Sequence, residues 1–460
     1  MEERMKRPMH NNAGSVLAGL RFLFGVFFIM ATITGIVSVQ AAELHKSLLV
    51  LDSHIDIPLD YATDKNNDPG AYEVPLLVNL DAAERGGYGC AFLVAYTPQG
   101  ALDLESTAKA RLKFADNRLD GIERMCDTYS NRVALARSTE DVKRIRAEGR
   151  QAVAIGMENG YPIGEDISLI KHYYQRGVRY ITLTHNGHNR ISDSCNPLNK
   201  PYASGKNLDA NSIRLLQDIY LAEARAAGPP EPLHGGLSKF GRQAVEEMNR
   251  LGIMVDISHT SPSTVEDVLE CSTAPIIASH SCCRDLADNP RNLTDQQIKA
   301  IAALGGVVQI TSVSSFVGFP DGRYEALDVL LEKLGVLEAG YMDLLELFEN
   351  DRGAYDKISS RYHEAIAEID SLYPWPGLSE FVDHIDHVVR VAGIKYVGIG
   401  SDFDGGGKLA GFAGPEDAPA VTSELQRRGY TEEQIRMIWG GNFMRVWGEV
   451  EEVARGMGKQ

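Results

Sequence analysis

Two histidines in the middle of the chain stand at matching places and could bind a metal ion together. Each is preceded by a serine and follows a short apolar run: His259 follows Gly252–Ile257, and His280 follows Ala274–Ala278. Such β-branched runs are typical of buried strands, and Pro262–Cys271 between them is compatible with a helix. Because ligands bind at the carboxyl ends of the strands in parallel α/β folds, this unit places two imidazoles at a binding edge.

Other ionisable residues follow apolar runs elsewhere in the chain and complete a candidate metal site. They are His54, Asp56, Glu158, His185 and Asp402. Imidazoles mixed with carboxylate oxygens suit zinc or a similar divalent ion. Even five of these seven residues exceed what one tetrahedral zinc needs, so the set favours two ions about 3.5–4 Å apart, bridged by a carboxylate and a water.

Four of the residues form two ligand pairs. His54 and Asp56 can bind one ion together, because alternate residues of an extended strand share a face. His259 and His280 would bind the other ion. Any single histidine flanked by apolar residues is more often a hydrogen-bonded core group than a ligand. The metal interpretation is favoured because seven such residues gather at one edge of one predicted sheet.

The acidic residues also have a functional and a structural interpretation. Glu158 comes from a different strand from both ligand pairs and is the natural bridge, although alone it could cap a helix. Asp402 would carry the proton from outside the ligand set, although alone it could form an Asx turn before Gly405. Asp256 lies inside an apolar run, so we expect it to support the site or the fold rather than to bind metal.

Eight apolar runs are candidate strands, and their order predicts the fold. They are Ser47–Leu51, Tyr88–Tyr96, Ala152–Gly156, Tyr180–Leu183, Gly252–Ile257, Ala274–Ala278, Gly306–Ile310 and Lys395–Ile399. Helix-compatible segments lie between most of them: Leu104–Met125, Ile167–Arg176, Lys239–Leu251 and Asp295–Leu304. This alternation indicates a parallel sheet with helical crossovers, and eight units predict an α/β fold, a (β/α)8 TIM-like barrel.

Two connections are too long for plain βα loops. Asn186–Ser238 carries Pro, Gly and Asn and is interpreted as an extended loop over the barrel mouth. Residues 311–376, between the seventh and eighth strands, contain helical patterns around Ala326–Leu334 and Tyr355–Leu372. We interpret this segment as a helical insertion that could roof the site. The chain is expected to end in closing helices over Pro419–Arg428 and Thr431–Glu451.

The first 41 residues differ from the rest. Arg4, Lys6 and Arg7 precede the apolar run Phe22–Val39, and small residues follow at Ala41 and Ala42. This pattern predicts a secretory signal peptide cut after Ala41. The run is also about long enough to span a bilayer, so an uncleaved membrane anchor is the alternative. In either case residues 42–460 would form an exported barrel domain, secreted or periplasmic.

Composition excludes some partners and sites. The formal charge of −17 argues against nucleic acid and anionic lipid surfaces. None of the six cysteines forms a CxxC pair, so a zinc ribbon or a thioredoxin-like site is unsupported. Export permits disulfides, but the sequence selects no pair. Cys282 and Cys283 follow His280 and are interpreted as packed thiols rather than ligands.

Several short motifs occur in an order and spacing that match a known family. They are Asp52-Ser53-His54-Ile55-Asp56, Gly156-Met157-Glu158-Asn159-Gly160, Tyr180-Ile181-Thr182-Leu183-Thr184-His185, Val255-Asp256-Ile257-Ser258-His259, Ala278-Ser279-His280-Ser281, Arg291-Asn292, Gly400-Ser401-Asp402-Phe403-Asp404-Gly405 and Asn442-Phe443-Met444-Arg445-Val446. Over essentially the whole chain after residue 41, the sequence resembles the membrane dipeptidase (renal dipeptidase) family, zinc peptidases related to the amidohydrolase superfamily.

The resemblance implies a zinc dipeptidase with two Zn²⁺ per chain, which hydrolyses the peptide bond of a small dipeptide through a metal-bridging hydroxide. It implies the same metal ligands as the residue patterns, namely His54, Asp56, Glu158, His259 and His280, and the same proton carrier, Asp402. Two roles come from the resemblance alone: His185 would steady the oxyanion, and Arg291 would hold the substrate carboxylate. The resemblance also implies a homodimer.

Two other functions stay open at this point. A related binuclear metal amidohydrolase could act on another small amide or a lactam. A carboxylate-binding arginine at position 291 separates this alternative from a dipeptidase, because amidated dipeptides would then lose most activity. A non-catalytic binding protein with a relic metal site is disfavoured by the intact set of five ligands and Asp402.

Overall fold

The computed structural model describes residues 41–63, 67–71, 74, 76–196, 210–228 and 231–458. The predicted signal peptide or anchor lies outside these residues, apart from Ala41. Within the described ranges, no helix combines the length and hydropathy needed to cross a membrane.

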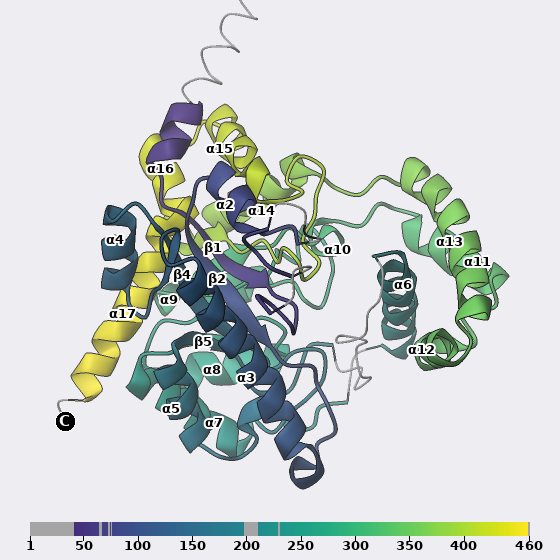
Figure 1. Ribbon diagram of the computed structural model, residues 1–460, viewed down its shortest axis with the longest axis horizontal. Coiled ribbons are helices and arrows are strands. Elements are labelled where there is room, and N and C mark those ends of the chain that lie inside the picture. Colours follow the sequence, from purple (N-terminus) through teal and green to yellow (C-terminus); the bar gives the residue numbers. More distant parts are fainter. Residues whose placement is uncertain are drawn as a thin grey trace, which may run out of the picture.

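Eight parallel strands form a ring at the centre of the molecule (Figure 1). In ring order they are β1 (Val50–Asp56), β2 (Tyr88–Tyr96), β4 (Gln151–Glu158), β5 (Val178–Thr182), β6 (Met254–Asp256), β7 (Ile277–Ala278), β8 (Val307–Ile310) and β9 (Val397–Ile399). A parallel bridge between Ile55 and Phe403 closes the ring, and the backbone N–H of Asp56 donates to Phe403 O at 2.9 Å. The predicted (β/α)8 barrel is therefore confirmed.

Helices cover the outside of this barrel. They are α2 (Leu80–Arg85), α3 (Leu104–Thr128), α4 (Thr139–Ala147), α5 (Ser168–Arg176), α7 (Lys239–Leu251), α8 (Pro262–Cys271), α9 (Asp295–Ala303), α14 (Leu378–Val391), α15 (Ala418–Arg427) and α16 (Glu432–Arg436). Local signals set their ends. Ser238 and Ser261 accept hydrogen bonds from first-turn amides of α7 and α8, Pro262 opens α8, and Gly252 ends α7 at φ 84°, a left-handed conformation that suits glycine.

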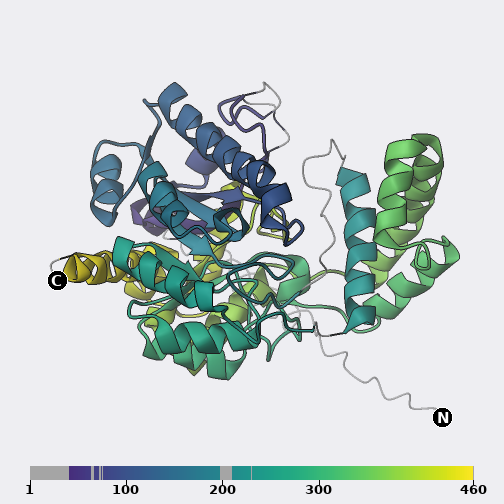
Figure 2. The same ribbon diagram turned by 90° about the horizontal axis from the view of Figure 1, so that it is seen from below.

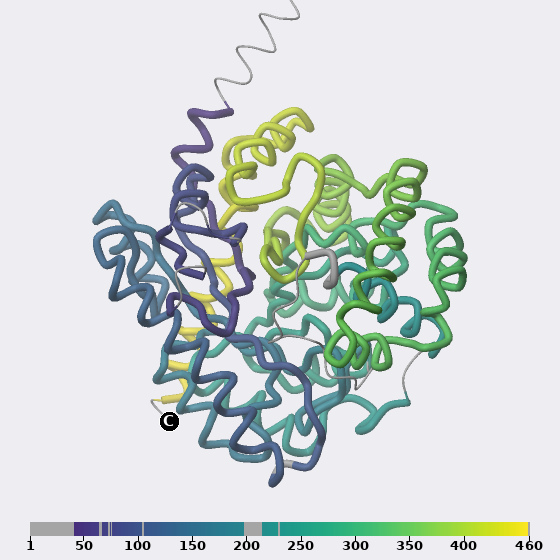
Figure 3. Tube along the Cα trace, turned by 45° about the vertical axis from the view of Figure 1, so that its right-hand side comes forward, coloured from purple at the N-terminus to yellow at the C-terminus, as the bar shows by residue number. Residues whose placement is uncertain are grey.

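The last helix, α17 (Asn442–Met457), closes one end of the barrel. Its side chains Phe443 and Trp447 lie 5.1 and 5.2 Å, centroid to centroid, from the ring of Phe92 on β2. They share one buried cluster with inward-facing residues of β1, β5 and β7. Figure 3 shows this helix in yellow beside the purple and blue amino-terminal strands. The polar strand ends therefore lie at the opposite, open end of the ring.

Two details of the sheet correct the sequence prediction. The first strand was expected over Ser47–Leu51 but runs over Val50–Asp56, so His54 and Asp56 lie within the strand rather than after it. Pairing with β2 on one side and with Phe403 on the other extends the strand through these polar residues. A ninth strand, β3 (Val133–Leu135), was not predicted; it pairs with the amino-terminal half of β4.

Four helices form a separate module beside the mouth of the barrel (Figures 1 and 2). They are α6 (Ala210–Ala227), α11 (Arg323–Lys333), α12 (Gly340–Asn350) and α13 (Arg352–Leu372), and the short helix α10 (Ser314–Val317) lies between α6 and α11 in the sequence. The helical patterns expected in the insertion correspond to α11 and α13. The expectation of an extended loop over Asn186–Ser238 was wrong for α6, because Leu215, Leu216 and Ile219 pack into the apolar core of the module.

The cysteines are unpaired. Cys282 Sγ donates to Thr311 O at 3.4 Å, and Cys283 Sγ donates to His384 O at 3.5 Å. Both thiols are buried and face backbone carbonyls, which agrees with the interpretation of packed thiols.

Candidate active site

Glu158, at the end of β4, lies at the centre of the predicted site. Its Oε1 atom is 3.1 Å from His259 Nε2 and 3.5 Å from His280 Nε2. Its Oε2 atom is 3.7 Å from His54 Nε2. The two oxygens of one carboxylate thus face two different sets of histidines, and this is the arrangement expected of a ligand that bridges two metal ions.

His54 offers a nitrogen that no protein group satisfies. Its Nε2 atom is buried and has no hydrogen-bond partner among the described residues. It faces carboxylate oxygens of Asp56 at 3.7 Å, Glu158 at 3.7 Å and Asp402 at 4.0 Å. A divalent cation at this place would give the nitrogen a partner and offset the carboxylate charges, so the residues fit a metal ion.

His259 and His280 point their Nε2 atoms at each other across 3.0 Å. Their other ring nitrogens have partners, because His259 Nδ1 lies 3.2 Å from Asn186 Oδ1 and His280 Nδ1 lies 2.9 Å from Ser279 Oγ. If both Nδ1 atoms carry the proton and donate it, both Nε2 lone pairs converge on one point. Converging lone pairs repel unless a cation lies beside both, so this pair also fits a metal ion.

All seven residues predicted from the sequence belong to one continuous site. Their ligand atoms lie within 4.8 Å of one another in three overlapping groups: His54, Glu158 and His280; Glu158, His185 and His259; and His54, Asp56 and Asp402. The Nε2 atom of His185 lies 3.8 Å from Glu158 Oε1, and its ring centroid lies 4.2 Å from that of His259. His185 therefore stands beside the second ligand pair.

The carboxylates create a place for positive charge. Burial alone lowers the pKa of His54, but the charges of Glu158, Asp56 and Asp402 outweigh it and raise that pKa to about 9. Burial, with the charge of Glu158, raises the pKa of Asp402 to about 6 and that of Asp56 well above its usual range. Without metal, this pocket therefore retains protons that a divalent ion would replace.

The opposite side of the site keeps its histidines neutral. Burial lowers the pKa of His185 to about 4, and the positive charge of Arg291 contributes. Burial, again with Arg291 contributing, holds the pKa values of His259 and His280 well below their usual range. Neutral imidazoles are the form that binds metal ions and that can donate one ring N–H to a substrate.

The backbone turns sharply after several of these strands. Asn159, His259, Asp402 and Asp404 have φ values of 76°, 66°, 63° and 63°. Such left-handed conformations cost free energy for most residues, and Asn, Asp and His tolerate them best. Strained backbone of this kind clusters at functional sites. The site residues thus take their places partly through the chain path and not only through side-chain rotamers.

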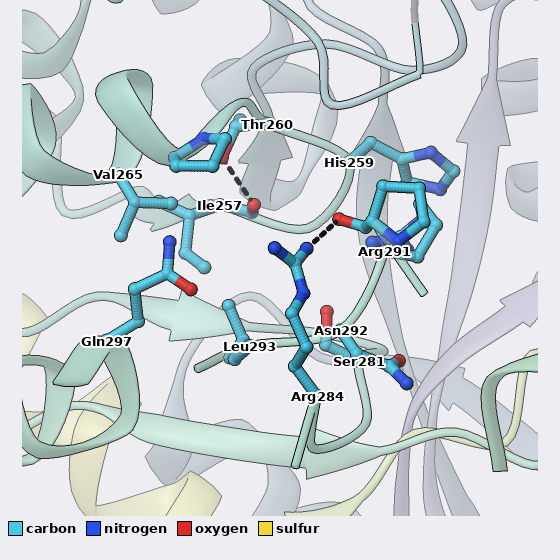
Figure 4. A pocket seen from close by; sticks show the side chains of 12 residues that line it. Ile257, His259, Thr260, Val265, Ser281, Arg284, Arg291, Asn292, Leu293 and Gln297 are labelled. Carbon is cyan, nitrogen blue, oxygen red and sulfur yellow. Dashed lines mark hydrogen bonds between the residues drawn. The ribbon is translucent and has the colours of Figure 1, made fainter. Parts of the chain in front are cut away.

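Arg291 lies next to a small pocket beside the metal-site histidines (Figure 4). The side chain is 5% exposed, stands 5.2 Å over the ring of Phe316, and donates from Nη2 to His280 O at 3.0 Å. Its Nε atom has no partner among the described residues. Arg284 lines the same pocket but is occupied by backbone carbonyls of the 289–290 turn. Arg291 therefore keeps a buried N–H group that none of the described residues satisfies.

Comparison with known proteins agrees with this geometry. The profile of the family described as "Membrane dipeptidase (Peptidase family M19)" matches residues 38–218 and 212–460. The chain belongs to the membrane dipeptidase family. It is a hydrolase of the metallodipeptidase class, as the resemblance in the sequence implied. Dipeptidase verJ from Clonostachys rogersoniana is 31% identical over 430 residues, which cover 91% of this chain and 88% of that protein.

Solved structures of membrane dipeptidase relatives share the fold. The probable dipeptidase PvdM from Pseudomonas aeruginosa aligns with a TM-score of 0.74 and 31% identity over 91% of this chain and 99% of its own. A metallo peptidase from Rhodobacter sphaeroides, liganded with a phosphinate mimic of the dipeptide L-Ala-D-Ala, aligns with a TM-score of 0.63 and 20% identity over 88% of this chain and 99% of its own. At 20% identity, the similarity to the Rhodobacter sphaeroides structure shows a shared fold alone.

Sequence reasoning missed the residues that hold the dipeptidase ligands in place. Asp52 accepts hydrogen bonds from the backbone of His54 and Ser401, and so ties β1 to the end of β9. Tyr180 places its hydroxyl 2.9 Å from His54 Nδ1. Both positions looked like ordinary strand residues, and the polar Asp52 beside an apolar run was the one available signal. Asp256, expected to play a supporting part, is fully buried and accepts from four donors.

Proposed function

We propose that the protein is a binuclear zinc dipeptidase that cleaves free dipeptides. The observation that carries the proposal is the position of Glu158 between an orphaned His54 nitrogen and the converging nitrogens of His259 and His280. His54 and Asp56 would hold one ion, His259 and His280 the other, and Glu158 would bridge them. When bound, such ions acidify water and polarise a carbonyl.

The chain itself supplies proton transfer and charge stabilisation. Asp402 is buried beside both Asp56 and His54, and a carboxyl group with a pKa near 6 can take a proton and return it close to neutral pH. Neutral His185 can donate a ring N–H to the oxygen that becomes negative as the peptide bond breaks. Donors of this kind often contribute about 3–4 kcal/mol to a reaction barrier.

Arg291 would select the substrate by its carboxyl terminus. A guanidinium can hold a carboxylate through two parallel hydrogen bonds, and Arg291 lines a small pocket together with the proposed ligand His259. This arrangement favours dipeptides over longer peptides. The mimic of L-Ala-D-Ala bound by the Rhodobacter sphaeroides metallo peptidase makes dipeptides with a D-residue at the second position a reasonable part of the substrate panel.

The test is hydrolysis of a panel of L,L- and L,D-dipeptides by metal-stripped and zinc-reconstituted protein. We expect zinc to restore cleavage, and Asp402→Asn to lower kcat by roughly 10²–10⁴-fold while zinc content stays at the wild-type level. Bound zinc without cleavage of any dipeptide would contradict the proposal and favour another small amide or a lactam as substrate.

A second arm of the experiment tests Arg291. C-terminal amidation of the best dipeptide should raise KM strongly in the wild-type enzyme, because the guanidinium loses its carboxylate. In Arg291→Gln the acid and the amide should be cleaved with similar kcat/KM. If amidation lowers kcat/KM by the same factor in the variant as in the wild type, the Arg291 guanidinium and the substrate carboxylate do not interact.

A further inference from the structure

One buried hydroxyl touches ligands of both proposed metal positions. Ser279 Oγ lies 2.9 Å from His280 Nδ1 and 3.3 Å from His54 Nδ1, and Ser279 is 0% exposed. The two histidines come from β1 and from the end of β7, and they belong to different ions in the proposed binuclear centre. A single serine thus stands behind both halves of the site.

Asp256 fixes the direction of the hydrogen bonds made by this serine. Its Oδ2 atom lies 2.6 Å from Ser279 Oγ and 2.5 Å from Thr182 Oγ1, while Oδ1 accepts from the backbone N–H groups of Ser258 and Ser279. An ionised carboxylate accepts only, and a hydroxyl has one proton and two lone pairs. The proton of Ser279 therefore goes to Asp256, and the lone pairs of Ser279 are left for the two imidazoles.

This direction decides which nitrogen of each imidazole is free. Because Ser279 can only accept from the rings, its hydrogen bonds place the proton of His280 and of His54 on Nδ1, and the Tyr180 hydroxyl, 2.9 Å from His54 Nδ1, then accepts from His54 as well. Their Nε2 atoms then carry lone pairs, which face Glu158 and the proposed metal positions. We propose that Asp256 and Ser279 are positioning residues that set the tautomer of one ligand of each metal ion. The inference rests on the proposed binuclear function and deepens it.

The hydrogen bond between Ser279 and Asp256 predicts that the more conservative substitution is the more harmful one. In Asp256→Asn, the amide oxygen keeps the two backbone N–H groups, so the NH₂ group faces Thr182 and Ser279. The amide then donates to Ser279, whose own proton turns toward an imidazole. That ring must accept on Nδ1 and carry its proton on Nε2, where it blocks the metal. The isosteric Asp256→Asn should therefore be more harmful to metal binding than Ser279→Ala, which removes the hydroxyl.

The experiment measures the two zinc dissociation constants of the intact protein by competition with a chelator. Loss of an outer hydrogen-bond partner typically weakens metal binding about 10–100-fold, so Ser279→Ala should weaken both constants by that factor. Tyr180→Phe removes a partner of His54 and of Ser279 but none of His280, so it should weaken mainly one constant. Asp256→Asn should weaken zinc binding more than Ser279→Ala does. Adding Ser279→Ala to Asp256→Asn should return the zinc dissociation constants to those of Ser279→Ala alone.

Thr182→Val is the matched control. It also removes one hydroxyl that donates to Asp256 Oδ2, but Thr182 touches neither ring, so both constants should stay near wild type. Thermal unfolding of the metal-free variants distinguishes a purely structural defect from the tautomer effect. A structural defect would lower the melting temperature, but it would not make zinc binding weaker in Asp256→Asn than in Ser279→Ala. Unchanged constants in Ser279→Ala, or a double variant worse than Asp256→Asn, would overturn the tautomer role. A wild-type protein that binds fewer than two zinc ions would instead overturn the binuclear centre.

Discussion

The barrel mouth gathers charged side chains from the ends of six strands, whereas the module gathers apolar side chains from four helices. At the mouth, buried groups such as Asp52, Asp256 and Glu158 are held by backbone that is paired on both sides. In the module, Leu215, Ile219 and Tyr341 form a core that shares no residue with the barrel clusters. We therefore expect the geometry of the candidate metal site to be independent of how the module packs.

The polar contacts of the two regions differ in the same way. In the module, Arg323 and Arg214 both bind Asp370, at 2.6 and 2.7 Å, and these ion pairs join helices to one another. At the mouth, Asp52 and Asp256 accept hydrogen bonds from backbone amides and a hydroxyl, while oxygens of Asp56, Glu158 and Asp402 converge on His54 Nε2. The first arrangement fixes a shape, while the second keeps unsatisfied groups in place for a ligand.

The largest effect is expected from a methyl group at the mouth. A Cβ at Gly405 would collide with carboxylate oxygens of both Asp56 and Asp402. Both oxygens can swing away, so Gly405→Ala should fold normally but lose at least about 100-fold in kcat/KM, roughly 3 kcal/mol. Steady-state kinetics and zinc analysis check this expectation. Gly414→Ala, where the added Cβ meets no atom within 4 Å, is the control and should behave as wild type.

A smaller effect, confined to the module, is expected from Asp370→Asn. The change leaves Arg323, which is 2% exposed, and Arg214 without their carboxylate; because Asp370 is itself 33% exposed, the loss should be about 1–2 kcal/mol, between that of an exposed and that of a buried pair. Hydrogen exchange should show faster opening of α6, α11 and α13, with unchanged zinc content. Asp356→Asn on the same helix breaks an exposed pair with Arg352 and should cost about 0.5 kcal/mol or less. Zinc loss in Asp370→Asn would contradict the independence of the two regions.

The third effect is absent at neutral pH and grows as the pH falls; it concerns the segment after His280. His384 accepts from Cys283 N and donates to Val317 O, and burial lowers its pKa from 6.5 to about 4. Below pH 6.5 the His384 side chain is protonated in the unfolded chain but stays neutral in the folded protein. The free energy of unfolding therefore falls as the pH drops toward 4, by up to about 3 kcal/mol.

Replacing His384 by Gln tests this pH dependence, because Gln can make both backbone contacts without titrating. Urea unfolding of metal-free protein between pH 7 and pH 4 should show a flatter loss of stability in His384→Gln than in the wild type. His172→Gln, at a half-exposed position, should leave the wild-type slope unchanged. Equal slopes in all three proteins would mean that His384 takes up its proton in the folded state.

The barrel and the gathering of these ionisable residues at its mouth could be predicted because both follow from strand ends, which apolar runs mark in the sequence. Asp402 and Glu158 were found in this way. Arg291 was not, since it lies on a loop after β7 and no run points to it; the family resemblance supplied it. Helix α6 was missed because its apolar face has meaning only against helices more than 100 residues later in the chain.

The hydrogen-bond partners of the ligands could not be predicted for a related reason. Ser279 and Asp256 are visible in the sequence, but the direction of their hydrogen bond depends on two strands lying side by side. The export of residues 42–460, the homodimer and the count of two zinc ions stay predictions, because they concern residues or partners outside the described structure.

The closing edge of the barrel imposes an order on the maturation of the enzyme. Ser401 N donates to Asp52 Oδ1 across 349 residues of chain, and Asp402 N donates to His54 O beside it. Contacts between residues so far apart form slowly, and they cannot form before the ribosome has made nearly the whole chain. Glu158, His259 and His280 are synthesised long before Asp402. The complete set of seven site residues therefore exists only in a closed barrel, and it first forms in the compartment where the chain completes its folding.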